Sequence, residues 1–432
     1  MNHTMKTYPL TQSQMDIFLD MMRYPQMTEY NLGQIVPLPP HIDLDRLEQA
    51  LMAIYAARQV LHIRFMMQGD EPRQMVDDTR ELKVTRLNLT EDQCEKFLKE
   101  GRRPFDPLSD ILCRFWLIEL PERKMMVYDF CHLIMDGISI TLHFMKKDLP
   151  LAYEGLALPE RCYDILSWAD EEGETFQSSA YEKDKEYYRQ HFQGCQLLSI
   201  AANASAPLGR YIQHDEYLPQ QDLDSWCKER GTAPNLLFMA AFGYTLSVLD
   251  KKEYFSFATI SHGRVKHQIR QAYGLFAHIA PIRVIVSVEA MVIDFIQSFR
   301  AEMSGTIRHG SYPFSHFCRD MLMKPSVYFN YLGREITEDM ILEGVLYPSE
   351  SWDPSIVSSD LSLYVFERGG QYDLRLITSD KLYSRGELLK LAQMIKTVTQ
   401  QMIAHPDATL REFSLASSLK ARPECRQEPG QR

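Results

Sequence analysis

A histidine, an aspartate and a glycine stand close together in the stretch FCHLIMDGIS, residues 130–139. The apolar run before this stretch is typical of a strand, and after Gly137 the apolar residues recur at helical spacing. His132 is therefore expected at a strand end, with Asp136 and Gly137 at a helix start. An imidazole can take a proton from an amine or hydroxyl near neutral pH if another group fixes its tautomer. A glycine at a helix start lets a backbone N–H approach a developing oxyanion.

The same residues also have a purely structural interpretation. A single histidine beside an apolar strand is more often a packed core or surface residue, and Asp-Gly is a common turn or helix cap. Spacing alone favours this structural interpretation, so other parts of the chain must decide between the two.

The surrounding sequence predicts the elements that would position this stretch. Thr11 and Gln14 form a capping box that begins an amphipathic helix. The segments ILCRFWLIEL and KMMVYDFCHL predict a hairpin that ends at His132. Helices and strands alternate through the rest of the chain, which favours a mixed α/β sandwich.

A polar, acidic segment at residues 169–184 indicates a crossing between two halves. We expect an N-terminal half at residues 1–175, a C-terminal half at 176–417, and a polar tail or linker at 418–432.

The composition excludes several classes of protein. The net charge of −11 gives no general attraction for nucleic acid. The eight cysteines form no CxxC pair, so we expect buried thiols in a reducing compartment and no metal site. The first residues lack the apolar core of a signal peptide, and the longest apolar run is too short to span a bilayer. A cytoplasmic location without a membrane span is therefore expected.

The chain resembles the condensation domains of nonribosomal peptide synthetases, which share a superfamily with chloramphenicol acetyltransferase. FCHLIMDGIS resembles the His-His-x-x-x-Asp-Gly motif of that family. Further matches follow in the order of the family: YPLTQSQMDIFL, RQVLHIRF, RRPFDPLSDILCRFWLIEL, APNLLFMAAFGYTLSVL, SHGR, GLFAHIAPIRV, SYPF and VYFNYLG.

The resemblance implies two chloramphenicol-acetyltransferase-like halves in a V-shaped pseudo-dimer with a central tunnel. A donor and an acceptor carrier protein would present their substrates on phosphopantetheine arms, and other synthetase domains are further expected partners. The acceptor amine would attack the donor thioester to form an amide. No cofactor bound by the chain itself is implied.

The family roles are carried over to individual residues. His132 matches the motif histidine that is tied to activity, either as a general base or as a positioning group. Asp136 is expected to be structural and to pair with Arg283 on the strand of the APIRV match. Gly137 is expected to line the reaction centre, with an oxyanion role inferred from its position.

Three residues depart from the family pattern. Cys131 replaces the first histidine of the motif, where a small apolar thiol can support the shape of the site; a reactive thiol is the less favoured interpretation. Ile138 stands where tryptophan is common, near the expected tunnel. His278 stands where asparagine is common, and it is expected either to line the acceptor side or, as the favoured interpretation, to be a buried structural histidine.

These matches predict an acyltransferase that forms amides between carrier-bound substrates. Because the first motif lies so near Met1, we expect an N-terminal domain that attaches an acyl group to the first amino acid. Two alternatives stay open: acyl transfer from a carrier or coenzyme A to a soluble alcohol or amine, and a non-catalytic platform that recruits carriers.

Overall fold

The computed structural model describes residues 6–161, 163–198, 208–336, 340–357 and 361–412. The chain divides into two compact units. Unit 1 contains residues 1–178, 262–277 and 338–356, and unit 2 contains 179–261, 278–337 and 357–432. The predicted halves were contiguous, whereas the chain returns twice to unit 1 after first leaving it. The predicted tail at 418–432 lies outside the described residues.

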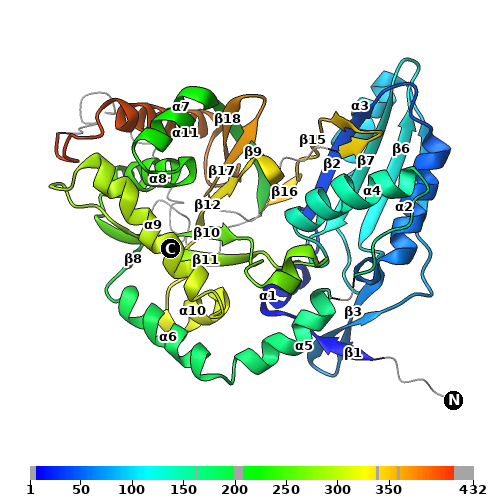
Figure 1. The fold of residues 1–432 in the computed structure, drawn as a ribbon, viewed down its shortest axis with the longest axis horizontal. Helices are drawn as coiled ribbons and strands as arrows, with labels where there is room; N and C mark the ends of the chain where they lie inside the picture. The colour runs from blue at the N-terminus through cyan, green and yellow to red at the C-terminus, as the bar shows by residue number, and fades with distance from the viewer. Residues whose placement is uncertain (1–5, 162, 199–207, 337–339, 358–360, 413–432) are drawn as a thin grey trace, which may run out of the picture. The chain divides into compact units, whose positions relative to one another are not determined.

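Unit 1 is built around a mixed five-stranded sheet of order β15-β2-β7-β6-β5 (Figure 1). The central strand β7 is antiparallel to both β2 and β6, while β5 runs parallel to β6. A smaller sheet has the order β1-β4-β3, and β13 and β14 form a hairpin. The strands of unit 1 are β1 (Thr7–Pro9), β2 (Asn31–Leu38), β3 (Ile63–Gln68), β4 (Glu71–Val76), β5 (Val84–Asn88), β6 (Cys113–Glu119), β7 (Lys124–Cys131), β13 (Met340–Leu342), β14 (Val345–Tyr347) and β15 (Glu350–Ser351).

The larger hydrophobic core of unit 1 includes side chains from both returning segments, such as Tyr273 and Leu342, and a smaller cluster forms around Trp352. The helices of unit 1 are α1 (Gln12–Arg23), α2 (Leu44–Ala57), η1 (Gln59–His62), α3 (Glu91–Glu100), η2 (Ser139–Asp148), α4 (Leu149–Tyr153), α5 (Ile165–Thr175) and η3 (His267–Gln271). Burial of apolar side chains from all three segments explains why distant parts of the sequence form one unit.

Unit 2 has its own core around a mixed sheet of order β11-β10-β12-β17-β18-β9-β16, with β8 paired to β10. Helices α8, α9 and α11 pack against this sheet. The helices are α6 (Ser179–His191), α7 (Gln220–Glu229), α8 (Pro234–Asp250), α9 (Val292–Arg308), α10 (Phe314–Met321), η4 (Arg334–Ile336) and α11 (Arg385–Ala404). The strands are β8 (Gln196–Leu197), β9 (Gly209–Pro219), β10 (Tyr254–Ser261), β11 (His278–Ile285), β12 (Val327–Leu332), β16 (Ile356–Val357), β17 (Leu361–Arg368) and β18 (Gln371–Ser379).

Several local predictions are confirmed. Thr11 and Gln14 form both bonds of a capping box at the start of α1. The predicted hairpin is the antiparallel pair of β6 and β7, so β7 ends directly before His132. The mixed α/β class is also confirmed.

Candidate active site

His132 follows the last residue of the central strand β7. Its backbone N–H donates to the Tyr30 carbonyl over 2.8 Å, and its side chain is half-buried. The Ile134 N–H donates to the Cys131 carbonyl over 3.1 Å, which closes a tight turn after the strand. The imidazole is therefore held just beyond the end of the central strand, with part of its surface exposed to solvent.

The tautomer of His132 follows from its hydrogen bond. Nδ1 lies 2.9 Å from the Met135 carbonyl oxygen, and a carbonyl can only accept, so Nδ1 carries the proton. Burial lowers the pKa of His132, although the Asp136 charge and the Met135 carbonyl act in the opposite direction. The neutral ring then presents Nε2 with a free lone pair, which is the form that a general base needs.

Asp136 is buried at the start of η2 and accepts hydrogen bonds on both carboxylate oxygens. The Ser139 N–H donates to Oδ1 over 2.8 Å, and the Phe276 N–H donates to Oδ2 over 3.0 Å. Burial alone would raise the pKa of Asp136, but the Arg264 charge and these amide bonds outweigh it and lower the pKa. Asp136 is therefore an ionised structural group, not a proton donor.

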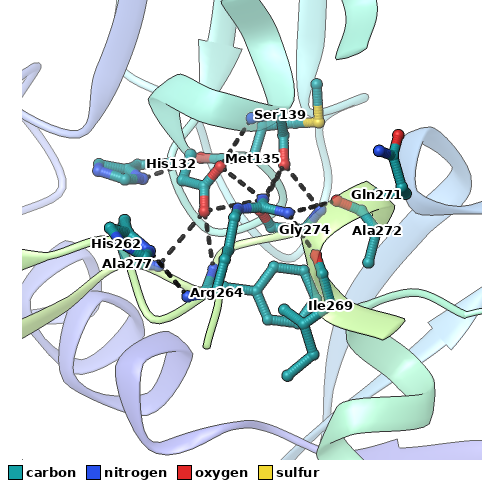
Figure 2. A network of polar contacts seen from close by, with 12 residues as sticks. His132, Met135, Ser139, His262, Arg264, Ile269, Gln271, Ala272, Gly274 and Ala277 are labelled. Carbon is teal, nitrogen blue, oxygen red and sulfur yellow. Dashed lines mark hydrogen bonds and ion pairs between the residues drawn. The ribbon is translucent and has the colours of Figure 1, made fainter. Parts of the chain in front are cut away.

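The partner of Asp136 is Arg264, so the predicted pairing with Arg283 is wrong. Arg264 Nη2 lies 2.8 Å from Oδ1 and 3.0 Å from Oδ2 of Asp136. Arg264 Nη1 donates to the carbonyls of Ile269 and Ala272, which Figure 2 shows beside the guanidinium. The segment 262–277, which returns to unit 1, thus supplies a buried arginine to the motif. The SHGR match in the sequence contains this arginine and could have indicated its role.

Ser139 and Gly274 complete this network, and sequence reasoning missed both. Ser139 Oγ donates to the Gly274 carbonyl over 2.8 Å and accepts from Gly274 N–H and Arg264 Nη2 (Figure 2). The Asp136 N–H also donates to the Gly274 carbonyl, over 3.2 Å. These bonds attach the returning segment to the C-terminal end of the motif, at Asp136 and Ser139.

Three other predicted residues lie in the same stretch. Cys131 is fully buried in the core, and burial raises the pKa of its thiol to about 12, so this thiol is a poor nucleophile at neutral pH. Gly137 is exposed two residues before η2, and Ile138, the residue directly before η2, is half-buried. Both His132 and Gly137 are therefore at least partly accessible to solvent.

The two remaining predicted residues, Arg283 and His278, belong to β11 in unit 2. Arg283 Nη2 donates to Glu302 Oε1 over 3.0 Å, so a carboxylate of its own unit neutralises it. His278 is the first residue of β11 and is half-buried. The structure thus brings His132, Asp136, Gly137, Cys131 and Ile138 together, and it places Arg283 and His278 in the other unit.

Metal ligation has no candidate site among the described residues, which contain no group of three or more His, Cys, Asp or Glu side chains placed to hold an ion. In this part of the chain no single helix is long and apolar enough to cross a membrane, although the bent pair of α7 and α8 meets the same criteria by length and composition.

The model of the family described as "Condensation domain" matches residues 4–422. Among curated proteins, the chain is 22% identical over 426 residues to tyrocidine synthase 2 of Brevibacillus parabrevis, covering 95% of this chain and 12% of that protein. It is 24% identical over 430 residues to surfactin synthase subunit 2 of Bacillus subtilis (strain 168), covering 95% of this chain and 10% of that protein. The chain therefore spans only a small part of these relatives.

Solved structures with the same fold include two condensation domains. A mutant of the starter condensation domain of rhizomide synthetase, in complex with C8-CoA, aligns with a TM-score of 0.82 and 19% identity, covering 94% of this chain and 97% of that one. The first condensation domain of the CDA synthetase aligns with a TM-score of 0.80 and 17% identity, covering 94% and 98%.

Proposed function

Because the chain belongs to the condensation domain family, whose members form amide bonds by acyl transfer, we propose that it joins a donor acyl thioester to an acceptor amine. Both substrates would be carried on the phosphopantetheine arms of carrier proteins. The observation that carries this proposal is the bond from His132 Nδ1 to the Met135 carbonyl, because it leaves Nε2 unprotonated.

In this reaction the acceptor nitrogen attacks the thioester carbon, a C–N bond forms and the C–S bond breaks. His132 Nε2 receives the proton that the nitrogen loses and returns it to the departing sulfur, so protons balance over one cycle. The exposed backbone of Gly137 would approach the carbonyl oxygen as negative charge develops on it. Asp136 and Arg264 hold the turn and take no part in proton transfer.

We further propose that the donor is a fatty acyl group and the acceptor is the first aminoacyl residue of a peptide. The observation that favours this choice is the fold shared with a starter condensation domain whose complex contains C8-CoA. An acyl-coenzyme A could then serve as donor in place of an acyl-loaded carrier. The chain is proposed to act in the cytoplasm, beside other synthetase domains.

Intact-mass spectrometry of an aminoacyl-loaded carrier tests this function. After incubation with the protein and octanoyl-coenzyme A or an octanoyl-loaded carrier, the aminoacyl carrier should gain the mass of one octanoyl group. Transfer only to a free amine or alcohol would replace the proposal with the soluble-acceptor reaction. Binding of carriers without any transfer would replace it with the non-catalytic platform.

A further inference from the structure

A pair of buried glutamine side chains connects the start of α1 to the turn that carries His132. Gln14 and Gln74 each have 0% of their surface exposed. Gln14 Nε2 donates to Gln74 Oε1 over 2.9 Å, and Gln74 Nε2 donates to Gln14 Oε1 over 2.8 Å. Two amides that face each other in this way fix each other's orientation, because a flip of either one would oppose like groups.

The remaining hydrogen-bonding capacity of Gln14 is also used. Its Oε1 accepts from the Thr11 N–H over 3.0 Å as part of the capping box of α1. Its second Nε2 hydrogen goes to the Leu133 carbonyl over 3.0 Å. The side chain thus has two donor and two acceptor contacts, which is the full complement of a primary amide. Leaving any of these buried groups unpaired would be costly.

The Leu133 carbonyl belongs to the peptide unit at the centre of the motif turn. The N–H of the same peptide unit, from Ile134, donates to the Cys131 carbonyl. The peptide plane is therefore held at both ends, by Gln14 on its oxygen and by the strand end on its nitrogen. Two residues further along the same turn, the Met135 carbonyl holds the His132 ring. Fixing the Leu133–Ile134 peptide plane therefore restricts where that carbonyl can lie.

We infer that Gln14 is a positioning residue for the reaction and acts through the Leu133 carbonyl on the tautomer and placement of the His132 ring. Gln14 lies in α1, far from His132 in sequence, and it makes no contact with substrate in this role. Gln74 supports Gln14 and is itself held by a bond from Nε2 to the Pro9 carbonyl. The inference rests on the proposed function, because it presumes that His132 acts as the base.

Two variants of the full chain separate positioning from simple stability. Gln14→Met removes all four contacts at similar volume. Gln14→Glu keeps the acceptors for Thr11 and Gln74 but, when ionised, cannot donate to the Leu133 carbonyl. The matched control is Thr11→Ala, which removes the Thr11 Oγ bond to the Gln14 N–H and leaves the Leu133 contact in place. All variants are assayed at a temperature at which circular dichroism shows them folded.

The assay is octanoyl transfer to an aminoacyl carrier, measured as kcat and KM across pH. Both Gln14 variants should lower kcat by about tenfold or more with little change in KM, because small displacements of a catalytic group are expensive. Thr11→Ala should change kcat by less than about threefold. The Met135 bond raises the pKa of His132, so the acidic limb of kcat/KM should move to lower pH in the Gln14 variants and stay in place in Thr11→Ala.

His132→Ala is included so that two failures can be told apart. Suppose that His132→Ala loses transfer, but that the Gln14 variants have the same kcat and the same pH profile as Thr11→Ala. This result would overturn the positioning role of Gln14 and leave the proposed function standing. Full transfer by His132→Ala would overturn the positioning role together with the base role of His132, and absence of transfer by the unaltered protein would overturn the proposed function. Loss of transfer in His132→Ala together with the shifted limb in the Gln14 variants is the result we expect.

Discussion

At the scale of single residues, the ionised pair of Asp136 and Arg264 explains why an aspartate follows the motif histidine. Their side chains are 2% and 3% exposed, so removal of either residue would leave the charge of the other unpaired in the interior. Such a pair need not add much net stability, but breaking it is expensive. Its function is therefore to hold the returning segment against the motif turn.

We predict that Asp136→Asn lowers the free energy of unfolding by about 3–5 kcal/mol, because it leaves the Arg264 charge unpaired. Urea denaturation measures this change. A double-mutant cycle with Arg264→Met should give a coupling energy above about 1 kcal/mol, whereas a cycle with Arg283→Met should give a value near zero. Coupling to Arg283 in place of Arg264 would contradict the pairing described here.

His143 gives a second prediction at this scale. Burial, together with the positive charges of Arg264 and Arg161, lowers its pKa to about 3, and neither ring nitrogen has a hydrogen-bond partner among the described residues. The ordinary pKa of histidine is about 6.5, so below that pH the unfolded chain binds a proton that the folded chain does not. Stability should therefore fall as pH drops from about 6.5 towards 3.

The slope from this residue alone should approach about 1.4 kcal/mol per pH unit. In His143→Phe the ring volume is kept and the titrating group is lost, so stability in this range should become less dependent on pH. Urea midpoints at a series of pH values measure the difference between the two proteins. Identical pH dependence in both would show that His143 is not buried as a neutral ring.

At the scale of elements, the segment 262–277 needs a glycine at position 274. Gly274 has a φ of +147°, and a Cβ there would lie 2.5 Å from the Cβ of Ile165 in α5. Its backbone also holds Ser139 and Asp136. Backbone strain and steric overlap therefore act on the same residue.

We predict that Gly274→Ala destabilises the protein by about 2–4 kcal/mol. Gly155→Ala is the matched control, since Gly155 also has positive φ (+72°) but a Cβ added there would meet nothing within 4 Å. Gly155→Ala should therefore lower the stability only by the cost of backbone strain. Thermal unfolding of both variants compares them, and equal losses would show that contact with Ile165 is unimportant.

Elements set by neighbouring residues were predictable from the sequence. The capping box at Thr11 and the hairpin that ends at His132 both lie where their residue types place them. The helix after Gly137 was predicted as an α-helix, but it is a π-helix over Ser139–Asp148. Its apolar spacing indicated a helix but not which helical hydrogen-bond pattern the backbone adopts.

At the scale of the whole molecule, the partner of Asp136 could not be predicted because it depends on which later segment of the chain packs into unit 1. Arg264 follows strand β10 and Arg283 lies in strand β11, and local patterns do not indicate which one belongs to unit 1. His132, by contrast, was found from its own motif. A candidate residue such as His132 could therefore be proposed from local sequence, whereas the Asp136–Arg264 pair, which depends on long-range topology, was missed.

The interleaved units predict that residues 1–178 do not fold stably as an isolated fragment. This fragment lacks Arg264, which leaves Asp136 without its cation, and it lacks β15 at the edge of the five-stranded sheet. Near-ultraviolet circular dichroism should show no fixed aromatic packing. Addition of a peptide of residues 262–277 should restore part of it, and cooperative unfolding of the fragment alone would contradict the prediction.

The most direct test of the central claim compares His132→Ala with His41→Ala in the carrier acylation assay. His41 is a surface histidine paired with Glu343, so its loss should leave transfer unchanged. His132→Ala should remain folded and bind carriers but add no octanoyl mass to the aminoacyl carrier, a loss of at least about a hundredfold. Transfer by folded His132→Ala at the rate of His41→Ala would contradict the claim that this site performs the reaction through His132.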